Sequence, residues 1–424
     1  MNSERLVQKL NKRKIKVQSP FFNFIQRAAF YIITRKYKAE FHYNFDKEKM
    51  KGRQVILLAD HSSFDNFYFA IYGYPFVKLN TVMGYAHFFE RALFYIYVLG
   101  GAIPKKQFET DLRAVRQMSK VISMGGSLCL FPEGTYSFAG SNQPINPSTM
   151  NFIKQLGVDV VLCKSYGAYL SRPAYRKSSC KGHREYHYDI LFTKEELKQM
   201  DENAIYEKML SCFAYNDFKW EKEKQYSYNF KKGIATGMEK VLFYCPKCKK
   251  EFTLKTNKDE IYCDCGNRIK VDNHYKNIPL ENSVCDYDNL NEWYIAQRKM
   301  VKQEIMNPDF SISYECNMID IRTDHLRINP YYVCGEGNIK IDASGIRYIG
   351  TTYGENVDLF FDIKKIPCFK QDDNYYNFLY YHGKLYCFEP KEKNRTIKYM
   401  MVVEELHNLV DPIWAKAYND AYYS

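Results

Sequence analysis

Three short apolar runs, each ending in polar or turn-forming residues, set the strongest limit on the fold of this chain. Residues 55–59 (VILLA) precede Asp60 and His61, residues 127–131 (SLCLF) precede the turn PEGT at 132–135, and residues 158–163 (VDVVLC) form the third run. Helical stretches alternate with them between residues 45 and 230, which predicts an α/β domain with a mixed central sheet flanked by helices. Ligands of open α/β sheets bind outside the carboxyl ends of strands, so His61 and Glu133 fall where a site is expected.

Charge is distributed unevenly along the 424 residues. Residues 1–270 carry 44 basic and 26 acidic side chains, whereas residues 271–424 carry 17 and 23. The basic part therefore faces an anionic partner, which is a nucleic acid, a membrane surface or a phosphorylated substrate. The 38 Tyr and 29 Phe residues provide more ring surface than packing usually needs, and such rings suit a boundary between water and an apolar phase.

Residues 1–44 are predicted to be a basic arm followed by an amphipathic helix. Within residues 20–36 apolar side chains recur every three or four positions, so the helix would lie in the headgroup layer of a membrane or pack on its own domain. The sequence shows no signal peptide and no apolar stretch of the ~20 residues that span a bilayer. Thirteen cysteines without an export signal favour reduced thiols. We expect a cytoplasmic protein associated peripherally with the inner face of the membrane.

Four cysteines form two close pairs with 14 residues between them. Cys245 and Cys248 flank Pro-Lys, and Cys263 and Cys265 flank a single Asp. Four thiolates in this pattern suit the tetrahedral coordination of Zn²⁺, which predicts a zinc ribbon with a structural ion over residues 240–272. Because zinc ribbons often contact nucleic acid and this segment is basic, a nucleic-acid-binding protein is one alternative for the function.

The remaining residues are predicted to be a connector and a β-rich domain. Residues 273–330 form a helical or irregular connector with an amphipathic helix at 288–306, although a β-rich pattern already begins near residue 311. Residues 331–424 form the C-terminal domain, in which glycine turns separate short strands and a helix at 396–409 closes the domain. This order of elements resembles a pleckstrin-homology or GRAM-like module. Its negative charge suits contact with the α/β domain or a protein partner better than broad membrane binding.

His61 and Asp65 are the first candidate catalytic pair. If the strand turns into a helix at residue 61, the two side chains lie one turn apart on one face. A carboxylate bound to one imidazole nitrogen fixes the tautomer and leaves the other nitrogen as a base toward a hydroxyl. The same spacing also occurs in capping and surface pairs, so by itself it indicates little.

The segment FPEGTYS at residues 131–137 changes that interpretation. FPEGT-x-S, about 70 residues after His-Ser-Ser-x-Asp, resembles the PlsC-like glycerophospholipid acyltransferases (the 1-acylglycerol-3-phosphate acyltransferase group) over roughly residues 40–195. The resemblance implies that His61 is the general base and that Asp65 orients it, without a covalent acyl-enzyme. It also implies that Glu133, Gly134 and Thr135 shape the acceptor pocket and that the acyl donor is acyl-CoA or acyl carrier protein.

Two departures from the family pattern concern His61 itself. Asp60 replaces the usual Asn before the histidine. The spacing typical of the family falls on Asn66, which is not an acid. Either Asp65 is the partner in a tighter turn, or Asn66 orients the ring neutrally; we favour Asp65.

A third departure concerns the acceptor. Tyr136 replaces the usual Arg after FPEGT, and a Tyr cannot offer phosphate the bidentate fork of an Arg. The acceptor phosphate is then held by other cations or is absent. Lys105 and Lys106, which follow an apolar Gly-containing stretch, are candidates for substrate binding, although solvated loop lysines would look the same.

The sequence therefore predicts an acyltransferase in residues 45–235 that moves a fatty acyl group to a hydroxyl of a lysophospholipid or glycerol-phosphate-type acceptor. Membrane phospholipid is the expected anionic partner, and the oligomeric state is not predicted. The main alternative is a catalytically altered relative that binds lipid or acts as a scaffold. The nucleic-acid alternative is less favoured because no RNP-type or helix-turn-helix pattern is present.

Overall fold

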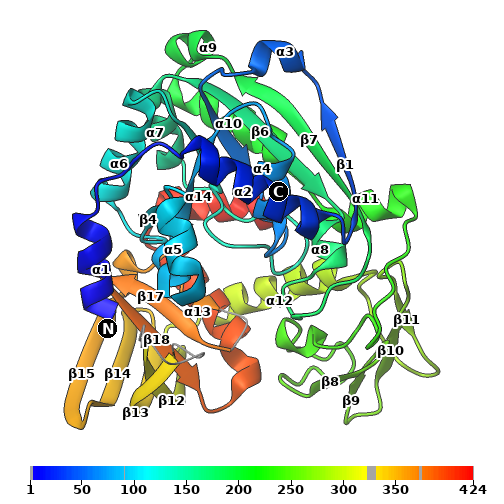
Figure 1. The fold of residues 1–424 in the computed structure, drawn as a ribbon. Coiled ribbons are helices and arrows are strands. Elements are labelled where there is room, and N and C mark those ends of the chain that lie inside the picture. Colours follow the sequence, from blue (N-terminus) through cyan, green and yellow to red (C-terminus); the bar gives the residue numbers. More distant parts are fainter. Residues whose placement is uncertain (1–2, 90, 322–330, 372–374, 424) are drawn as a thin grey trace.

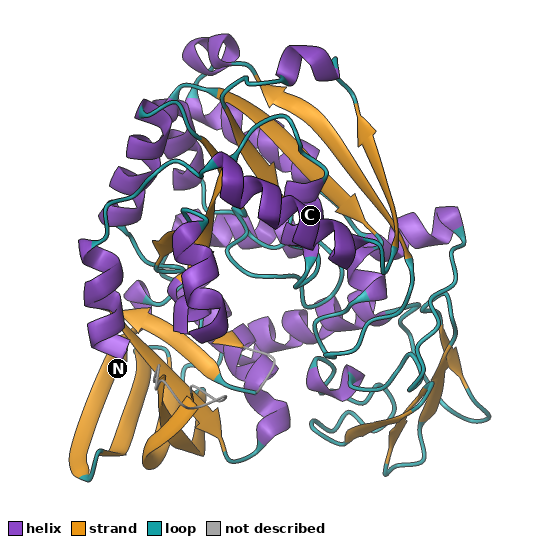
Figure 2. Ribbon diagram, viewed as in Figure 1, coloured by secondary structure: helices purple, strands orange, loops and turns teal. Residues whose placement is uncertain are grey.

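The computed structural model describes residues 3–89, 91–321, 331–371 and 375–423. Three sheets organise the chain: a seven-stranded sheet surrounded by helices, a small four-stranded sheet, and a second seven-stranded sheet (Figure 1). Helix α12 (Leu290–Glu304) lies between the two later sheets. Figure 2 shows that helices gather around the first sheet, whereas loops dominate the small one.

The first sheet has the order β1-β7-β6-β2-β5-β3-β4. Its strands are β1 (Lys38–Tyr43), β2 (Val55–Ala59), β3 (Leu79–Gly84), β4 (Ile103–Lys105), β5 (Ser127–Leu130), β6 (Asp159–Tyr166) and β7 (His183–Phe192). Strand β2 pairs in parallel with β5 and β6, whereas β6 and β7 are antiparallel. The sheet is therefore mixed, and the three apolar runs of the sequence are its neighbouring central strands β6, β2 and β5.

Helices cover both faces of this sheet. The helices that do so are α2 (Pro20–Thr34), α3 (Lys47–Met50), α4 (Asn66–Tyr72), α6 (Leu112–Ser123), α7 (Ser148–Leu156), α9 (Lys194–Gln199) and α10 (Glu202–Phe213). The other helices of this part of the chain are α1 (Ser3–Lys12), α5 (Arg91–Leu99), α8 (Ala168–Ser171) and α11 (Asp217–Lys224). Ile56 and Leu58 of β2 pack with side chains of α6, α7 and α10, whereas Val55 and Leu57 pack with α2 and α4. Since both faces are covered, β2 is apolar throughout rather than alternating.

The predicted amphipathic helix is α2. It begins after Ser19, whose hydroxyl accepts from the main-chain N–H of Phe22 (3.1 Å). Phe30 is buried against α4, whereas Phe21 and Phe24 are 75% and 72% exposed. The helix therefore packs on its own domain by one stripe and presents a second apolar stripe to the outside. No helix in the described ranges is both long and apolar enough to cross a membrane.

The small sheet has the order β11-β10-β9-β8 and holds the cysteine pairs. Its strands are β8 (Leu254–Asn257), β9 (Glu260–Cys263), β10 (Arg268–Val271) and β11 (Asn277–Pro279). All three strand pairings are antiparallel. These short strands lie within and just beyond residues 240–272, where a ribbon was predicted.

The third sheet begins inside the segment predicted as a connector. Its strands are β12 (Ser311–Ile321), β13 (Tyr331–Asp342), β14 (Gly345–Thr352), β15 (Glu355–Asp362), β16 (Lys370–Gln371), β17 (Asn377–Tyr381) and β18 (Lys384–Pro390). Strand β12 pairs with both β13 and β18, so the domain cannot be complete without it and does not start at residue 331. Residues 322–330, the end of the predicted connector, lie outside the described residues.

Two helices follow the third sheet and return toward the first. Helix α13 (Thr396–Asn408) is buried along almost its whole length, and α14 (Pro412–Tyr422) follows it. The fully buried Arg298 of α12 forms ion pairs with Glu404 and Glu405 of α13. Tyr422 of α14 donates a hydrogen bond to Gln143 of the α/β domain (2.7 Å). The C-terminal domain therefore packs against the α/β domain.

Candidate active site

The two sequence motifs meet at the carboxyl ends of β2 and β5. The main-chain N–H of Ser137 donates to the carbonyl of His61 (2.9 Å). The carboxylate of Glu133 accepts from the main-chain N–H of His61 (2.6 Å) with one oxygen and from that of Gln143 (2.6 Å) with the other. Glu133 therefore fixes the loop that carries His61 to the FPEGT loop.

Glu133 and Asp60 are both buried at this junction. Burial and the nearby charge of Asp60 raise the pKa of Glu133 well above its usual value. Burial raises the pKa of Asp60 to about 6, although its carboxylate accepts hydrogen bonds from the main-chain N–H (2.8 Å) and hydroxyl (2.6 Å) of Ser165. Asp60 therefore connects the two central strands β2 and β6.

His61 points one ring nitrogen at the main chain. Its Nδ1 lies 3.2 Å from the carbonyl oxygen of Ser63, and because a carbonyl only accepts, Nδ1 carries the proton. Burial, followed by the charge of Lys370, lowers the pKa of His61 to about 3. Nε2 is then an unprotonated acceptor at neutral pH, and the hydrogen bonds of the described residues leave it without a partner.

Asp65 does not bond to His61. Residues 61–65 form turns, and helix α4 begins only at Asn66, so the predicted helical face shared by His61 and Asp65 is not formed. The carboxylate of Asp65 faces the fully buried Arg184 (2.9 Å) and also Arg172 (3.3 Å). Burial opposes its charge, but these two guanidinium groups overcome burial and lower the pKa of Asp65 to about 2.

Asn66 does not bond to His61 either. Its amide nitrogen donates to the main-chain carbonyl of Asp60 (2.8 Å), and its buried Oδ1 has no partner among the described residues. In this structure the carbonyl of Ser63, rather than Asp65 or Asn66, orients the ring of His61. Ordinary sequence patterns do not reveal a main-chain acceptor, which explains why neither alternative included it.

The other two predicted residues of the FPEGT loop are held differently. Gly134 has a φ of +71°, a left-handed conformation that glycine adopts without strain. Its carbonyl accepts from the side-chain amide of Gln107 (2.6 Å). Thr135 is buried, and its hydroxyl has no hydrogen-bond partner among the described residues. Gly134 lines the cavity described next, whereas Thr135 does not.

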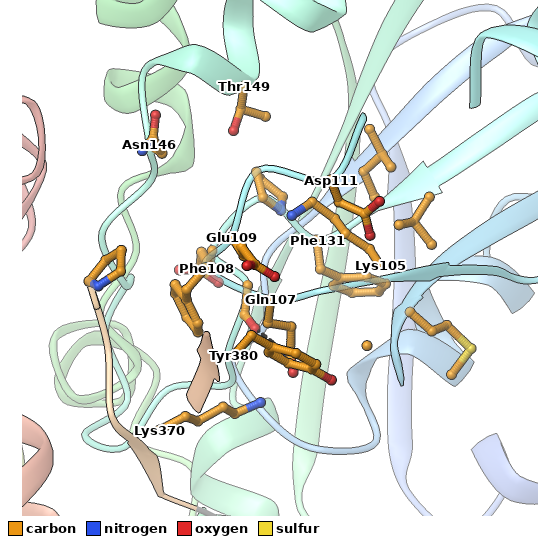
Figure 3. A pocket seen from close by; sticks show the side chains of 18 of the residues that line it. Lys105, Gln107, Phe108, Glu109, Asp111, Phe131, Asn146, Thr149, Lys370 and Tyr380 are labelled. Carbon is orange, nitrogen blue, oxygen red and sulfur yellow. Dashed lines mark hydrogen bonds between the residues drawn. The ribbon is translucent and has the colours of Figure 1, made fainter. Parts of the chain in front are cut away.

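His61, Glu133 and Gly134 open into a cavity of about 860 Å³ between the first sheet and the C-terminal domain. One part of the wall is apolar and comes from the α/β domain: Val82, Met83, Val115, Met118 and Phe152. Another part comes from the C-terminal domain: Lys364, Lys365, Lys370, Tyr380, Tyr381 and Trp414. Figure 3 shows Lys370 and Tyr380 among side chains of the α/β domain such as Gln107 and Phe131. A cavity of this size suits a ligand with an apolar portion and a few polar groups.

The two predicted lysines differ in position. Lys105 lines the cavity, and its ammonium group donates to the carbonyl of Lys106 (3.0 Å). Burial lowers the pKa of Lys105. Lys106 does not line the cavity, and its ammonium group faces Glu109 (4.0 Å). The structure therefore brings Lys105, but not Lys106, to the candidate site.

Two residues of the site were not identified from the sequence. His87 lines the cavity, and burial together with Lys370 lowers its pKa to about 4. Lys370 comes from β16, far from both motifs in the chain. His87 stands in an aromatic segment that resembles an ordinary core helix, and nothing in the sequence of the C-terminal domain indicates that its strands reach the cavity.

The four predicted metal ligands come together in the small sheet. The sulfurs of Cys245, Cys248, Cys263 and Cys265 all lie within 4.8 Å of one another, and the pairs 245–265 and 248–263 are 3.8 Å apart. A tetrahedron with metal–sulfur bonds of about 2.3 Å has edges of about 3.8 Å, so the sulfurs fit a metal ion. Cys245 and Cys248 lie on one tight turn, and Cys263 and Cys265 lie on another. The main-chain N–H of Lys249 donates to the carbonyl of Cys245, and that of Gly266 donates to the carbonyl of Cys263 (both 3.0 Å). This cluster can hold a metal.

Comparison with known proteins gives a distant structural likeness. No protein-family model matches the chain, and no curated protein matches it. One solved structure, the 1-acyl-sn-glycerophosphate (LPA) acyltransferase PlsC from Thermotoga maritima, is similar with a TM-score of 0.33 and 18% identity, over 44% of this chain and 74% of that chain. At this level the similarity is distant, and it leaves the reaction to be argued from the residues of the cavity.

Proposed function

We propose that the protein is an acyltransferase that moves a fatty acyl group from a thioester to a hydroxyl of a lysophospholipid or glycerol-phosphate-type acceptor. The observation that carries this proposal is the environment of His61. The neutral ring faces a partly apolar cavity with Nδ1 bonded to Ser63, and Glu133 fixes its main chain. A neutral imidazole with one free nitrogen is what a general base toward a hydroxyl requires.

In the proposed reaction, Nε2 of His61 takes the proton of the acceptor hydroxyl. The hydroxyl oxygen attacks the carbonyl carbon of the thioester, the carbon–sulfur bond breaks, and the leaving thiolate receives the proton from Nε2. No acyl group is attached to the protein at any step. The apolar wall around Met83 and Met118 would hold the acyl chain.

Acyl transfer by the purified protein tests the proposal. Radiolabelled acyl-CoA and acyl carrier protein are offered with a panel of lysophospholipids, glycerol 3-phosphate and monoacylglycerol, and the lipid products are extracted. We expect transfer by the wild type and its loss in His61→Ala. His42→Ala is the matched control, because His42 lies on the outer strand β1 and does not line the cavity. If no donor and acceptor give turnover that depends on His61, the protein is a lipid-binding or scaffolding relative instead.

We also propose that the four-cysteine cluster holds Zn²⁺ in a structural role. Its support is the all-sulfur donor set, which suits a closed tetrahedral zinc site with no open position. Asn267 reinforces the cluster, because its amide points toward the sulfur of Cys245 (3.9 Å) and also donates to the carbonyl of Val284 (2.9 Å). The ion would stabilise a small sheet that has few apolar residues of its own.

The same enzyme would work at the surface of a phospholipid membrane. The exposed stripe of α2 and the exposed Tyr95, Ile96 and Leu99 of α5 support this proposal. The two helices adjoin, because the ring of Phe22 on α2 lies against Gly100 at the end of α5. Apolar side chains with cations such as Arg27 and Arg35 beside them are typical of helices that lie in the headgroup layer.

A further inference from the structure

The C-terminal domain places one buried cation in the wall of the cavity. Lys370 of β16 is only 7% exposed, and it lines the cavity together with His61. Its ammonium group lies 5.6 Å from the ring centre of Tyr136 and 5.4 Å from that of Phe378. Buried lysines are rare, and this one lies in the wall of the cavity beside the candidate base.

The charge of Lys370 acts on the histidines of the cavity. After burial, it is the largest influence that lowers the pKa of both His61 and His87. Tyr136, whose ring lies beside Lys370, also contacts His61, with ring centres 6.0 Å apart. Lys370 is therefore close enough to act on a group that is bound next to the base.

Most carboxylate oxygens of the same wall bind main-chain donors. Glu109 accepts from the N–H of Gly383 (2.8 Å) with one oxygen, and its other oxygen faces the ammonium group of Lys106 (4.0 Å). Asp411 accepts from the N–H groups of Ile413 (2.9 Å) and Trp414 (3.2 Å). Asp111 accepts from the N–H groups of Lys106 (2.9 Å) and Ala114 (3.0 Å) at the start of α6. The raised pKa of Glu133 disfavours its charge. The part of the wall that comes from the C-terminal domain carries Lys364, Lys365 and Lys370 against Asp411, so this side of the cavity is net positive and suits an anion.

We propose that Lys370 binds the phosphate of the substrate, so that the C-terminal domain selects phosphorylated substrates for the α/β domain. The inference rests on the proposed function, because it assigns the substrate class of that same site. Tyr136 supplies no charge, and Lys370 puts a cation over its ring from another part of the chain. A lysine acts as a point charge with three donors, which suits a phosphate monoester without a bidentate fork.

The phosphate can belong to the acceptor or to the coenzyme of the donor, and the experiment separates these sources. One arm compares lysophosphatidic acid with monoacylglycerol as acceptors at a fixed donor. The other arm compares acyl-CoA with an acyl thioester of N-acetylcysteamine, which carries no phosphate, at a fixed acceptor. Each arm is measured with the wild type, Lys370→Met and Lys370→Arg.

We expect Lys370→Met to raise the KM for the phosphate-bearing member of one pair by about tenfold or more, the loss of one charge-assisted contact. The KM for the phosphate-free member should change little, and Lys370→Arg should restore most of the preference. Lys384→Met is the matched control, because Lys384 also lies over a ring of the third sheet (Tyr386, 5.3 Å) but does not line the cavity. Equal losses for both members, or no loss, would overturn the proposal.

Two additions keep the test decisive. The double variant Lys370→Met/Tyr136→Arg returns a cation to the same part of the wall. If it recovers the phosphate preference, then Lys370→Met lost that preference through charge rather than through packing. Equilibrium binding of lysophosphatidic acid and monoacylglycerol, below their critical micelle concentrations, needs no turnover. The binding measurement therefore decides the inference even if the protein transfers no acyl group. A wild type that binds lysophosphatidic acid more tightly than monoacylglycerol, with this preference lost in Lys370→Met, supports the inference. A wild type without this preference refutes it.

Discussion

Asp65→Asn distinguishes a structural role of Asp65 from a role in orienting the base. In the structure Asp65 is the counter-ion of Arg184, and it also accepts from the hydroxyls of Tyr37 (2.8 Å) and Ser63 (2.8 Å). Asparagine has nearly the same shape but no charge. Arg184, which is fully buried, would keep its hydrogen bond to the hydroxyl of Ser171 (2.6 Å) and its contacts with the rings of Tyr37 and Phe69, but it would lose the charge of Asp65.

The size of the effect follows from the pKa of Asp65. Its pKa falls from the ordinary 3.8 to about 2, which corresponds to about 2 kcal/mol of stability contributed by the charge. Breaking a buried pair by removing one partner generally costs about 3–5 kcal/mol. We therefore expect Asp65→Asn to lower the free energy of unfolding by about 2–5 kcal/mol at pH 7, measured by urea denaturation followed by circular dichroism.

The pH dependence gives this prediction a second signature. The folded pKa of Asp65 is depressed, so its contribution is complete above pH 4 and is lost as the pH falls from 4 toward 2. The difference between the wild type and Asp65→Asn should shrink over that range. The double variant Asp65→Asn/Arg184→Met should recover part of the loss, because the unpaired cation is gone. A fully stable Asp65→Asn variant whose kcat is lost would refute the reasoning and make Asp65 the partner of His61.

Three other expectations concern the base, the metal and the membrane. Because the pKa of His61 is held at about 3, kcat/KM should show no acidic limb centred near pH 6.5, and such a limb in the pH profile would contradict a base that stays neutral. Mass spectrometry with plasma excitation should find one zinc per chain, and Cys265→Ser should lower that content; equal metal in both proteins would exclude the cluster. Phe21→Asp/Phe24→Asp should weaken sedimentation with anionic vesicles by about tenfold or more, since each buried ring contributes about 1.5–3 kcal/mol, while Phe360→Asp, which is also exposed, should not.

The sequence predicted the parts of the fold that depend on local patterns. Strand β2 begins and ends at the predicted residues, and the helices at 20–36, 288–306 and 396–409 correspond to α2, α12 and α13 within one or two residues at either end. The edge strand β1 and its neighbour β7 were not predicted. Strand β1 pairs with β7, and β7 pairs with β6, through contacts between distant residues, which no local periodicity records.

The residues of the candidate site also differ in how far the sequence predicted them. His61, Glu133 and Gly134 were predicted because short motifs follow strands, and the structure brings them together at the cavity. The ion pair of Asp65 with Arg184 was not predicted, because Arg184 is more than one hundred residues away on β7. The contribution of Lys370 also depends on how two domains pack. Sequence patterns predict residues on one loop well, whereas partners from other elements require the tertiary structure.

The hydrogen bond from Tyr422 to Gln143 has a consequence for the order of folding. Gln143 in turn donates to the carboxylate of Glu133, which holds His61. Helix α14 therefore supports the loop of His61 through two intermediates. Synthesis must proceed past α14 before this support and the second wall of the cavity can form, so a nascent chain that ends before α14 would lack the complete cavity.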